Sequence, residues 1–367
     1  MKFKAGLTLL LCGTFLLQSC KLGRFVYYNY ANITDYKIFP ARAIKAPEAP
    51  FIFPQSQQPK PPRTVHIDGK DEDFEKYLAD HHTVAFLVIQ RDSIQYEKYF
   101  DSYSDTSVVA SFSMAKSITS ILLGIAIDEG YIRSIDEPIT NYIPELKKNG
   151  FDAVTLRHLL QMTSGLEFNE GYTNPFGHVA TFYYGTNLRK AINRLKLADE
   201  PGQRFRYTSG QTQLLGLALE RALKGRTVSS YLEEKVWQPL GMEFDASWSL
   251  DRKKDGLEKT FCCVNARARD FAKLGRLYLR KGNWNGRQIV SESWVSESTK
   301  VDSSDGSAWY YQHQWWLPTK GGDFLADGLL GQYIYVHPEK DLIIVRLGKK
   351  TGNINWQRLL PTIASAY

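Results

Sequence analysis

Cysteine and metal-binding patterns are scarce in this chain. Only four of its 367 residues are cysteines, and no group of cysteines and histidines has the spacing of a metal site. We therefore expect neither a metal nor another cofactor. Two of the cysteines, Cys262 and Cys263, are adjacent. Because neighbouring cysteines rarely reach disulfide geometry, we predict no ordinary structural disulfide between them.

Long apolar runs and blocks of positive charge are also missing. The most apolar N-terminal stretch, residues 7–17, is too short for a comfortable transmembrane helix. The formal net charge is +7, but the basic residues form no dense block, and no zinc-finger or phosphate-loop pattern occurs. The basic excess therefore predicts an ordinary solvated surface and no nucleic-acid partner.

The N-terminus has the pattern of a bacterial lipoprotein signal. Residues 1–19 combine Lys2 and Lys4 with the short apolar run, and the Leu-Gln-Ser-Cys sequence that ends at Cys20 resembles a lipobox. We expect cleavage before Cys20, a lipid on that cysteine, and attachment to a membrane of the bacterial cell envelope, on the periplasmic side or at the outer surface. The alternative is a simple N-terminal anchor.

Composition divides the rest of the chain into two parts. Residues 20–70 are rich in proline and glutamine, which predicts an extended Pro-rich tether. An aromatic run at residues 25–30 leaves open that part of this tether packs onto the domain. Residues 71–367 are expected to form the folded domain, and a chain with 43% hydrophobic residues can bury a sizeable core.

The pattern of helices and strands predicts a mixed α/β (α+β) fold. Strand patterns occur near both ends of the domain, whereas helical patterns dominate between them. The predicted strands are residues 84–89, 93–100, 332–336 and 342–347, and the clearest helices are residues 211–223 and 268–280. This order predicts an antiparallel sheet flanked by helices, plus an inserted helical region. The aromatic run 309–316 is expected to be one strand whose two faces pack the core and line a pocket.

The Ser-x-x-Lys sequence from Ser113 to Lys116 opens an apolar stretch that Gly130 follows. This pattern predicts a buried helix that stops at the glycine. Residues three apart share one helix face, so the Lys116 ammonium can reach the Ser113 hydroxyl. Burial makes a lysine a better base at neutral pH, and free N–H groups at a helix start favour negative charge. The alternative is a chance match, but the combination predicts an acyl-enzyme nucleophile.

Four further segments carry a family resemblance. They are residues 136–146, 155–166, 201–209 and 268–286. With the Ser-x-x-Lys sequence, they make the chain resemble serine β-lactamase/penicillin-binding-protein-like hydrolases, on the class C and esterase side, over about residues 75–360. Within that family the chain looks most similar to 6-aminohexanoate-dimer (nylon-oligomer) hydrolases and related esterases. The resemblance implies a β-lactamase-like fold.

The same resemblance implies roles for named residues. Ser113 would be the nucleophile and Lys116 its base. Tyr207, in a segment similar to the family's Tyr-x-Asn motif, would pass a proton to the leaving group. The backbone N–H groups of Ser113 and Leu329 would form the oxyanion hole.

The resemblance also implies substrate contacts, with two departures from the family. Residues 166–186 are expected to cover the site, with Tyr172 able to close onto substrate, and Ser209 and Gly328 are expected to contact it. Ser209 replaces the asparagine of Tyr-x-Asn and offers no amide group. Ala326 stands where the third motif has lysine or histidine, so no cation would hold a β-lactam carboxylate. Both departures favour linear amides or esters.

The expected function is therefore hydrolysis of a small-molecule amide or ester through an acyl-enzyme. Two alternatives remain. One is a peptidoglycan-directed DD-peptidase or weak β-lactamase, and the other is a catalytically silent binding lipoprotein. Because a binding protein need not keep Ser113, Lys116 and Tyr207 together, these three residues argue against the second alternative.

Overall fold

The computed structural model describes residues 21–367 except residues 29, 68 and 305. Its largest element is an antiparallel sheet of seven strands in the order β11-β12-β13-β14-β15-β4-β5. Both ends of the domain build this sheet, because β4 pairs with β15. The strands are β4 (Thr83–Gln90), β5 (Ser93–Tyr99), β11 (Tyr311–Gln312), β12 (Trp315–Trp316), β13 (Phe324–Gly328), β14 (Gln332–His337) and β15 (Leu342–Gly348).

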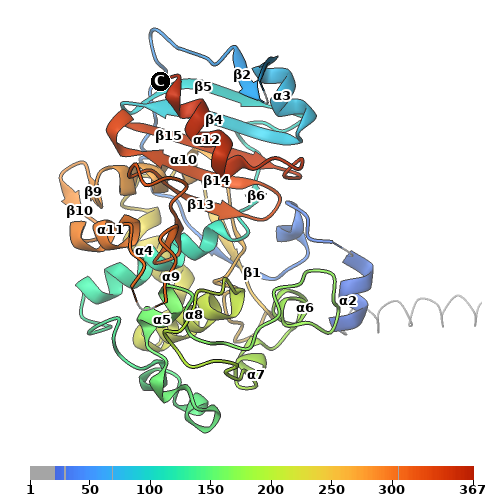
Figure 1. Ribbon diagram of the computed structural model, residues 1–367, viewed down its shortest axis with the longest axis vertical. Coiled ribbons are helices and arrows are strands. Elements are labelled where there is room, and N and C mark those ends of the chain that lie inside the picture. The colour runs from blue at the N-terminus through green and yellow to red at the C-terminus, as the bar shows by residue number, and fades with distance from the viewer. Residues whose placement is uncertain (1–20, 29, 68, 305) are drawn as a thin grey trace, which may run out of the picture.

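Helices cover both faces of the large sheet (Figure 1). On one face, α3 (Phe74–Asp80) and α12 (Trp356–Ser365) pack against side chains such as Phe86. The other face packs on α10 (Ala268–Leu279) and α4 (Met114–Asp128). Because successive side chains of a strand point to opposite faces, the apolar residues 84–89 of β4 serve both cores.

A helical region follows α4 in the chain and lies beyond one edge of the sheet layer (Figure 1). Its longest helix, α8 (Ser209–Ala222), packs directly on α4. The shorter helices are α5 (Leu156–Leu160), α6 (His178–Tyr184), α7 (Leu188–Ile192) and α9 (Val228–Leu232), the last continued by a π-helical turn (Glu233–Trp237). The predicted sheet, flanking helices and inserted helical region are thus confirmed.

A second, smaller sheet joins the N-terminal segment to the domain. Its strand order is β1-β7-β8-β6. The strands are β1 (Ala41–Ile44), β6 (Val109–Ala110), β7 (Ala246–Ser249) and β8 (Val264–Ala266). β6 leads directly into the start of α4, so this sheet positions the Ser-x-x-Lys sequence.

The expected Pro-rich tether is therefore wrong for much of residues 20–70. Ile33, Phe39, Ile44 and Phe53 are buried in the core, although the surrounding prolines suggested an exposed spacer. β1 pairs with β7, and the Phe51 N–H donates to the Gly241 carbonyl at 2.8 Å. Composition obscured the packing because apolar residues in this segment are widely spaced and form no helix or strand pattern.

The N-terminal helix α2 (Lys21–Tyr28) lies against α6 (Figure 1). The Phe25 ring meets the Tyr184 ring edge-on, with centroids 5.6 Å apart. Phe25 of the aromatic run therefore packs onto the domain, whereas Tyr27 and Tyr30 are mostly exposed. The predicted signal peptide and Cys20 lie outside the described residues.

The aromatic run 309–316 is a tight hairpin and not the single strand we predicted. Tyr311 pairs with Trp316 and Gln312 with Trp315. His313 and Gln314 between them both have positive φ, which reverses the chain in two residues. Neither residue is a glycine, so the turn left little local signal.

The remaining elements are short and lie mostly at the periphery. They are the hairpins β2–β3 (Thr64–Ile67, Lys70–Asp73) and β9–β10 (Asn283–Trp284, Arg287–Gln288), α11 (Glu292–Thr299), and 3-10 turns at Asp35–Lys37, Ile139–Asn141, Pro144–Asn149, Phe151–Ala153 and Pro338–Lys340. In the described part of the chain, no helix is both long and apolar enough to cross a membrane.

Candidate active site

The nucleophile candidate Ser113 stands at the N-terminus of α4, where a strained backbone presents it. The preceding residue, Phe112, has a φ of +44°, a conformation that is rare for a large side chain. Contacts to β8 hold this turn in place. The Ser111 N–H donates to the Val264 carbonyl at 2.8 Å, and the Val264 N–H donates to Ser111 Oγ at 3.1 Å.

Lys116 contacts Ser113 as the helix spacing predicted. Its Nζ donates to Ser113 Oγ at 2.9 Å, to Ser209 Oγ at 3.2 Å and to the Phe261 carbonyl at 2.9 Å. Three acceptors saturate an ammonium group, so its direction is fixed. Lys116 is only 1% exposed, and its position one turn into α4 places it between the sheet and α8.

Burial controls the protonation of Lys116. Removal from water lowers the pKa of the amine to about 8, while the nearby carboxylates of Glu170 and Asp327 oppose this effect. A lysine with this pKa is substantially neutral in mildly alkaline water. It can therefore accept the Ser113 proton, which an ordinary surface lysine cannot do.

Tyr207 completes the group that the resemblance implied. Its hydroxyl interacts with Ser113, although burial raises the pKa of the phenol well above its usual value. The ring packs beside Tyr311 and Trp316, with centroids 5.8 and 5.4 Å away, and the Lys116 ammonium lies 5.1 Å from its centroid. A neutral, positioned tyrosine hydroxyl can both donate and accept a hydrogen bond.

Ser209 brings an unexpected partner, Glu170, to the site. Ser209 Oγ donates to Glu170 Oε1 at 2.6 Å, and the Ser209 N–H donates to Glu170 Oε2 at 2.8 Å. The chain of contacts therefore runs from Ser113 through Lys116 and Ser209 to a carboxylate. Glu170 was not among the site residues predicted from the sequence. Two features of the sequence could have suggested it. Glu170 is an acidic residue two positions before Tyr172, and Ser209 stands where the family motif has an asparagine, so a different partner was needed there.

Gly328 is the last residue of β13, and Leu329 begins the turn to β14. Leu329 and Ser113 both line one cavity, as an oxyanion pair requires. Gly328 does not line that cavity. A Cβ on Gly328 would lie 2.3 Å from the Ser111 carbonyl oxygen, so glycine is needed for the close approach of β13 to the nucleophile turn.

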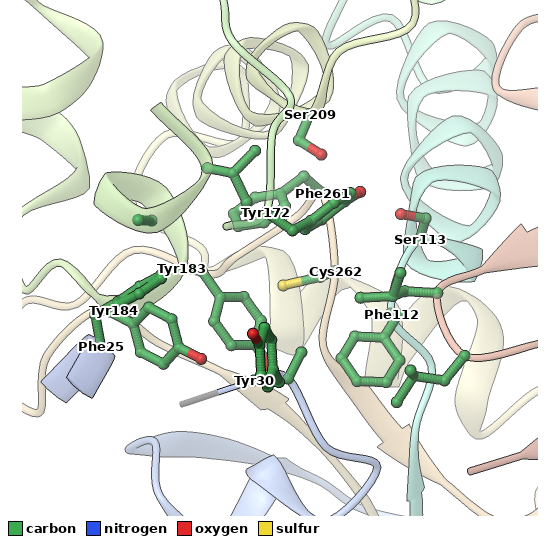
Figure 2. Close-up of a pocket in the computed structure, with 15 residues that line it drawn as sticks. Phe25, Tyr30, Phe112, Ser113, Tyr172, Tyr183, Tyr184, Ser209, Phe261 and Cys262 are labelled. Carbon is green, nitrogen blue, oxygen red and sulfur yellow. The ribbon is translucent and has the colours of Figure 1, made fainter. Parts of the chain in front are cut away.

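A cavity of about 290 Å³ opens beside Ser113 (Figure 2). Figure 2 shows Ser113 and Phe112 on one side, Ser209 and Tyr172 above, and aromatic side chains opposite. Tyr172 lines the cavity as expected and remains 44% exposed, with its hydroxyl 3.3 Å from Glu170 Oε1.

The prediction that Cys262 and Cys263 form no disulfide is wrong. The two sulfurs are bonded, and their Cα atoms lie 3.7 Å apart. Cys263 has a φ of +76°, so the local backbone departs from the conformations in which adjacent cysteines point apart. Cys262 lines the cavity, and the preceding residue, Phe261, supplies the carbonyl that binds Lys116.

Comparisons with known proteins agree with this geometry. The family described as Beta-lactamase matches residues 71–365. The chain belongs to the Beta-lactamase family. It is 28% identical over 297 residues to a 6-aminohexanoate-dimer hydrolase of Paenarthrobacter ureafaciens, which covers 75% of this chain and 74% of that protein. It is also 28% identical to Esterase EstB of Burkholderia gladioli, over 35% of this chain and 36% of that one.

A solved structure from Bacillus anthracis, provisionally named a 6-aminohexanoate-dimer hydrolase, has the same fold. The TM-score is 0.82 at 25% identity, over 93% of this chain and 94% of that chain. The 93% of this chain that the structural match covers is more than residues 71–365 contain. The match therefore includes part of the N-terminal segment as well. The family and fold that the sequence motifs suggested are both confirmed.

The third motif of this family member differs from the pattern named above. Ala326 is fully buried in β13 and cannot reach a substrate. The next residue, Asp327, accepts from Gln357 Nε2 at 2.7 Å, and burial raises the pKa of its carboxyl to about 7. This segment therefore offers an acid and a backbone turn, not a cationic side chain.

Proposed function

We propose that the protein is a serine hydrolase that cleaves linear amides or esters through an acyl-enzyme on Ser113. The observation that carries this proposal is the 2.9 Å contact between Ser113 Oγ and Lys116 Nζ, whose pKa burial lowers to about 8. The names of the relatives, a 6-aminohexanoate-dimer hydrolase and an esterase, support the same substrate class.

Acylation begins when neutral Lys116 accepts the Ser113 proton and Oγ attacks the substrate carbonyl carbon. The N–H groups of Ser113 and Leu329 would bind the oxyanion. Ser209 and the Phe261 carbonyl hold Lys116 in place, and Glu170 in turn holds Ser209. Pre-positioned groups of this kind need little reorganisation during the reaction.

The leaving group departs with a proton from Tyr207, which regains it from Lys116. Water then attacks the acyl-enzyme, and the same groups work in reverse to release the acid and restore Ser113. The role of Tyr207 rests on its contact with Ser113.

A DD-peptidase or weak β-lactamase remains the second candidate. Buried Ala326 argues against it, because no cation at the third motif would bind a β-lactam carboxylate. The decisive measurement is kcat/KM for nitrocefin against that for a short-chain nitrophenyl ester. We expect nitrocefin to be much the poorer substrate, and equal or higher values for nitrocefin would favour the second candidate.

Covalent probes separate the three functional hypotheses. A fluorophosphonate should label wild-type protein at Ser113, whereas a labelled penicillin should not. Labelling by both probes would indicate a penicillin-binding protein. Labelling by neither would indicate the silent binding lipoprotein.

We further propose attachment to the membrane of the bacterial cell envelope through a lipid on Cys20. The support is the sequence pattern that ends at this residue. Incorporation of radiolabelled palmitate in cells tests it. The Cys20→Ala variant should incorporate none, and equal labelling of variant and wild type would reject the lipid anchor.

A further inference from the structure

The cavity beside Ser113 is apolar over most of its lining. Phe112, Val179, Ala180 and Leu330 contribute hydrocarbon surface, and Phe261 adds an aromatic face. In the described part of the chain, no charged side chain lines it. A charged substrate group placed here would lose its water without gaining an ionic partner, which is unfavourable. The cavity therefore suits an uncharged, apolar part of a substrate.

A second cleft, which Tyr207 helps to line, has a more polar character. It is lined by Glu167, Glu170, Arg206 and Tyr207. Tyr207 belongs to this polar cleft and not to the apolar cavity, whereas Ser113 belongs to the cavity. Because Tyr207 is the proposed proton donor to the leaving group and does not line the apolar cavity, the leaving group is expected on the Tyr207 side of Ser113. The acyl group then points into the apolar cavity.

The N-terminal segment completes the far wall of this cavity. Phe25, Tyr30 and Ala31 line it, and all three precede the residues that match the family (Figure 2). They lie beside Tyr183 and Tyr184 of α6, which line the same side of the cavity. The wall is thus assembled from two segments far apart in the sequence.

Buried contacts anchor this wall to the domain. The Tyr183 hydroxyl donates to Asp35 Oδ2 at 2.7 Å, and the Phe39 ring meets the Tyr183 ring with centroids 5.1 Å apart. The Lys259 ammonium lies 3.3 Å from the Phe39 ring centroid. Side chains held in this way form a preformed surface, which selects ligands by shape with little loss of conformational entropy.

We propose that this cavity is an acyl-binding site for apolar carboxylic esters or amides, and that the N-terminal segment sets its acyl-chain preference. The inference rests on the proposed serine hydrolase function and specifies its substrate class. The acyl carbon forms a bond to Ser113 Oγ as its bond to the leaving oxygen or nitrogen breaks. The leaving group takes a proton from the Tyr207 side, and water later releases the apolar acid.

An acyl-chain series on the whole protein tests the cavity. Nitrophenyl acetate, butyrate, hexanoate and octanoate share one leaving group and differ only in acyl length. Each buried methylene is worth up to about fourfold in kcat/KM, so hexanoate should exceed acetate by about tenfold or more. A flat or falling series would overturn the proposal. A matched series of alkyl acetates should show no comparable gain, and a gain there instead would place the leaving group in the cavity and also overturn it.

Two neighbouring residues of α2 provide a matched pair for the wall. Phe25 lines the cavity, whereas Val26 is 69% exposed. Phe25→Ala should lower the hexanoate-to-acetate ratio by about threefold or more, because part of the apolar wall is lost. Ala31→Trp, which fills the cavity, should lower the same ratio further. Val26→Ala should keep the wild-type ratio, and an equal ratio in all four proteins would overturn the role of the segment.

The experiment separates this inference from the proposed function. Fluorophosphonate labelling of Ser113 together with hydrolysis of acetate supports the serine hydrolase, whatever the chain-length profile. Failure of both would reject the hydrolase itself. Circular dichroism and Tm identify any variant that does not fold, and because the ratio is measured within each protein, a partly inactive preparation does not affect it.

Discussion

Two lysines in this protein are buried in similar surroundings, yet only one is placed to act as a base. Lys116 and Lys259 are 1% and 0% exposed. Burial lowers the pKa of both amines. Each donates to a backbone carbonyl, of Phe261 and of Tyr183 respectively, and each lies near aromatic rings. The depressed pKa therefore does not distinguish them.

The difference lies in what else each amine contacts. Lys116 also donates to Ser113 Oγ, at the start of a helix and at the edge of a cavity. Lys259 instead lies between the Phe39 ring and Tyr183, where it joins the N-terminal segment to α6. A perturbed lysine becomes a candidate base only when a nucleophile is within hydrogen-bond reach.

The largest effect is expected for Ser113 and Lys116, the proposed nucleophile and its proposed base. Ser113→Ala and Lys116→Met should each lower kcat by about 10⁴-fold or more, since paired groups fail together. The measurement is steady-state hydrolysis of a nitrophenyl ester with active-site labelling. Tm should stay near the wild-type value for both variants. Appreciable turnover by folded Ser113→Ala would show that another group attacks the substrate.

Tyr207→Phe should cause the next largest loss of activity, because it removes one hydroxyl and keeps the ring. Loss of a positioned proton donor typically costs ~10²–10⁴ in rate. The cost should be greater for an anilide than for a nitrophenyl ester, since a nitrophenolate leaves without protonation and an amine does not. Comparable losses on both substrates would mean that Tyr207 positions Ser113 without supplying the proton.

Lys259→Met should show the reverse pattern to Lys116→Met. It leaves the buried Tyr183 carbonyl without its donor, which should lower the free energy of unfolding by about 1–3 kcal/mol. The rate of nitrophenyl acetate hydrolysis should fall far less for Lys259→Met than for Lys116→Met. Denaturant unfolding and kcat, both measured on these two variants, test whether Lys259→Met mainly lowers stability and Lys116→Met mainly lowers activity. If Lys259→Met removed activity with stability intact, the distinction between the two lysines would be wrong.

The smallest effect concerns pH. Because only neutral Lys116 can accept a proton, kcat/KM should rise with pH through about 8. Glu170 raises the pKa of Lys116, so Glu170→Gln should move the midpoint to lower pH. The test is the pH profile of kcat/KM for both proteins. A midpoint that stays in place would show that Glu170 acts only by holding Ser209.

Several parts of the site could be predicted because their signals are local. The apolar run after Ser113 predicted α4, and the spacing of three predicted the Lys116 contact. The segment around Tyr207 was recognisable as a motif and lies at the site. Alternating or continuous apolar runs likewise predicted β4, β5, β14 and β15 close to their observed bounds.

What the sequence by itself determined was the helix that presents Ser113, the Lys116 beside it and the class of fold, because periodicity and spacing within a few residues encode them. Only the tertiary structure decided that Glu170 reaches Ser209 and that Phe25 and Tyr184 share a wall. Contacts between distant segments leave no local pattern, since each partner looks like an ordinary loop or surface residue until the chain folds. The cavity beside Ser113 depends on such contacts, and so the class of chemistry could be predicted from the sequence where the shape of the cavity could not.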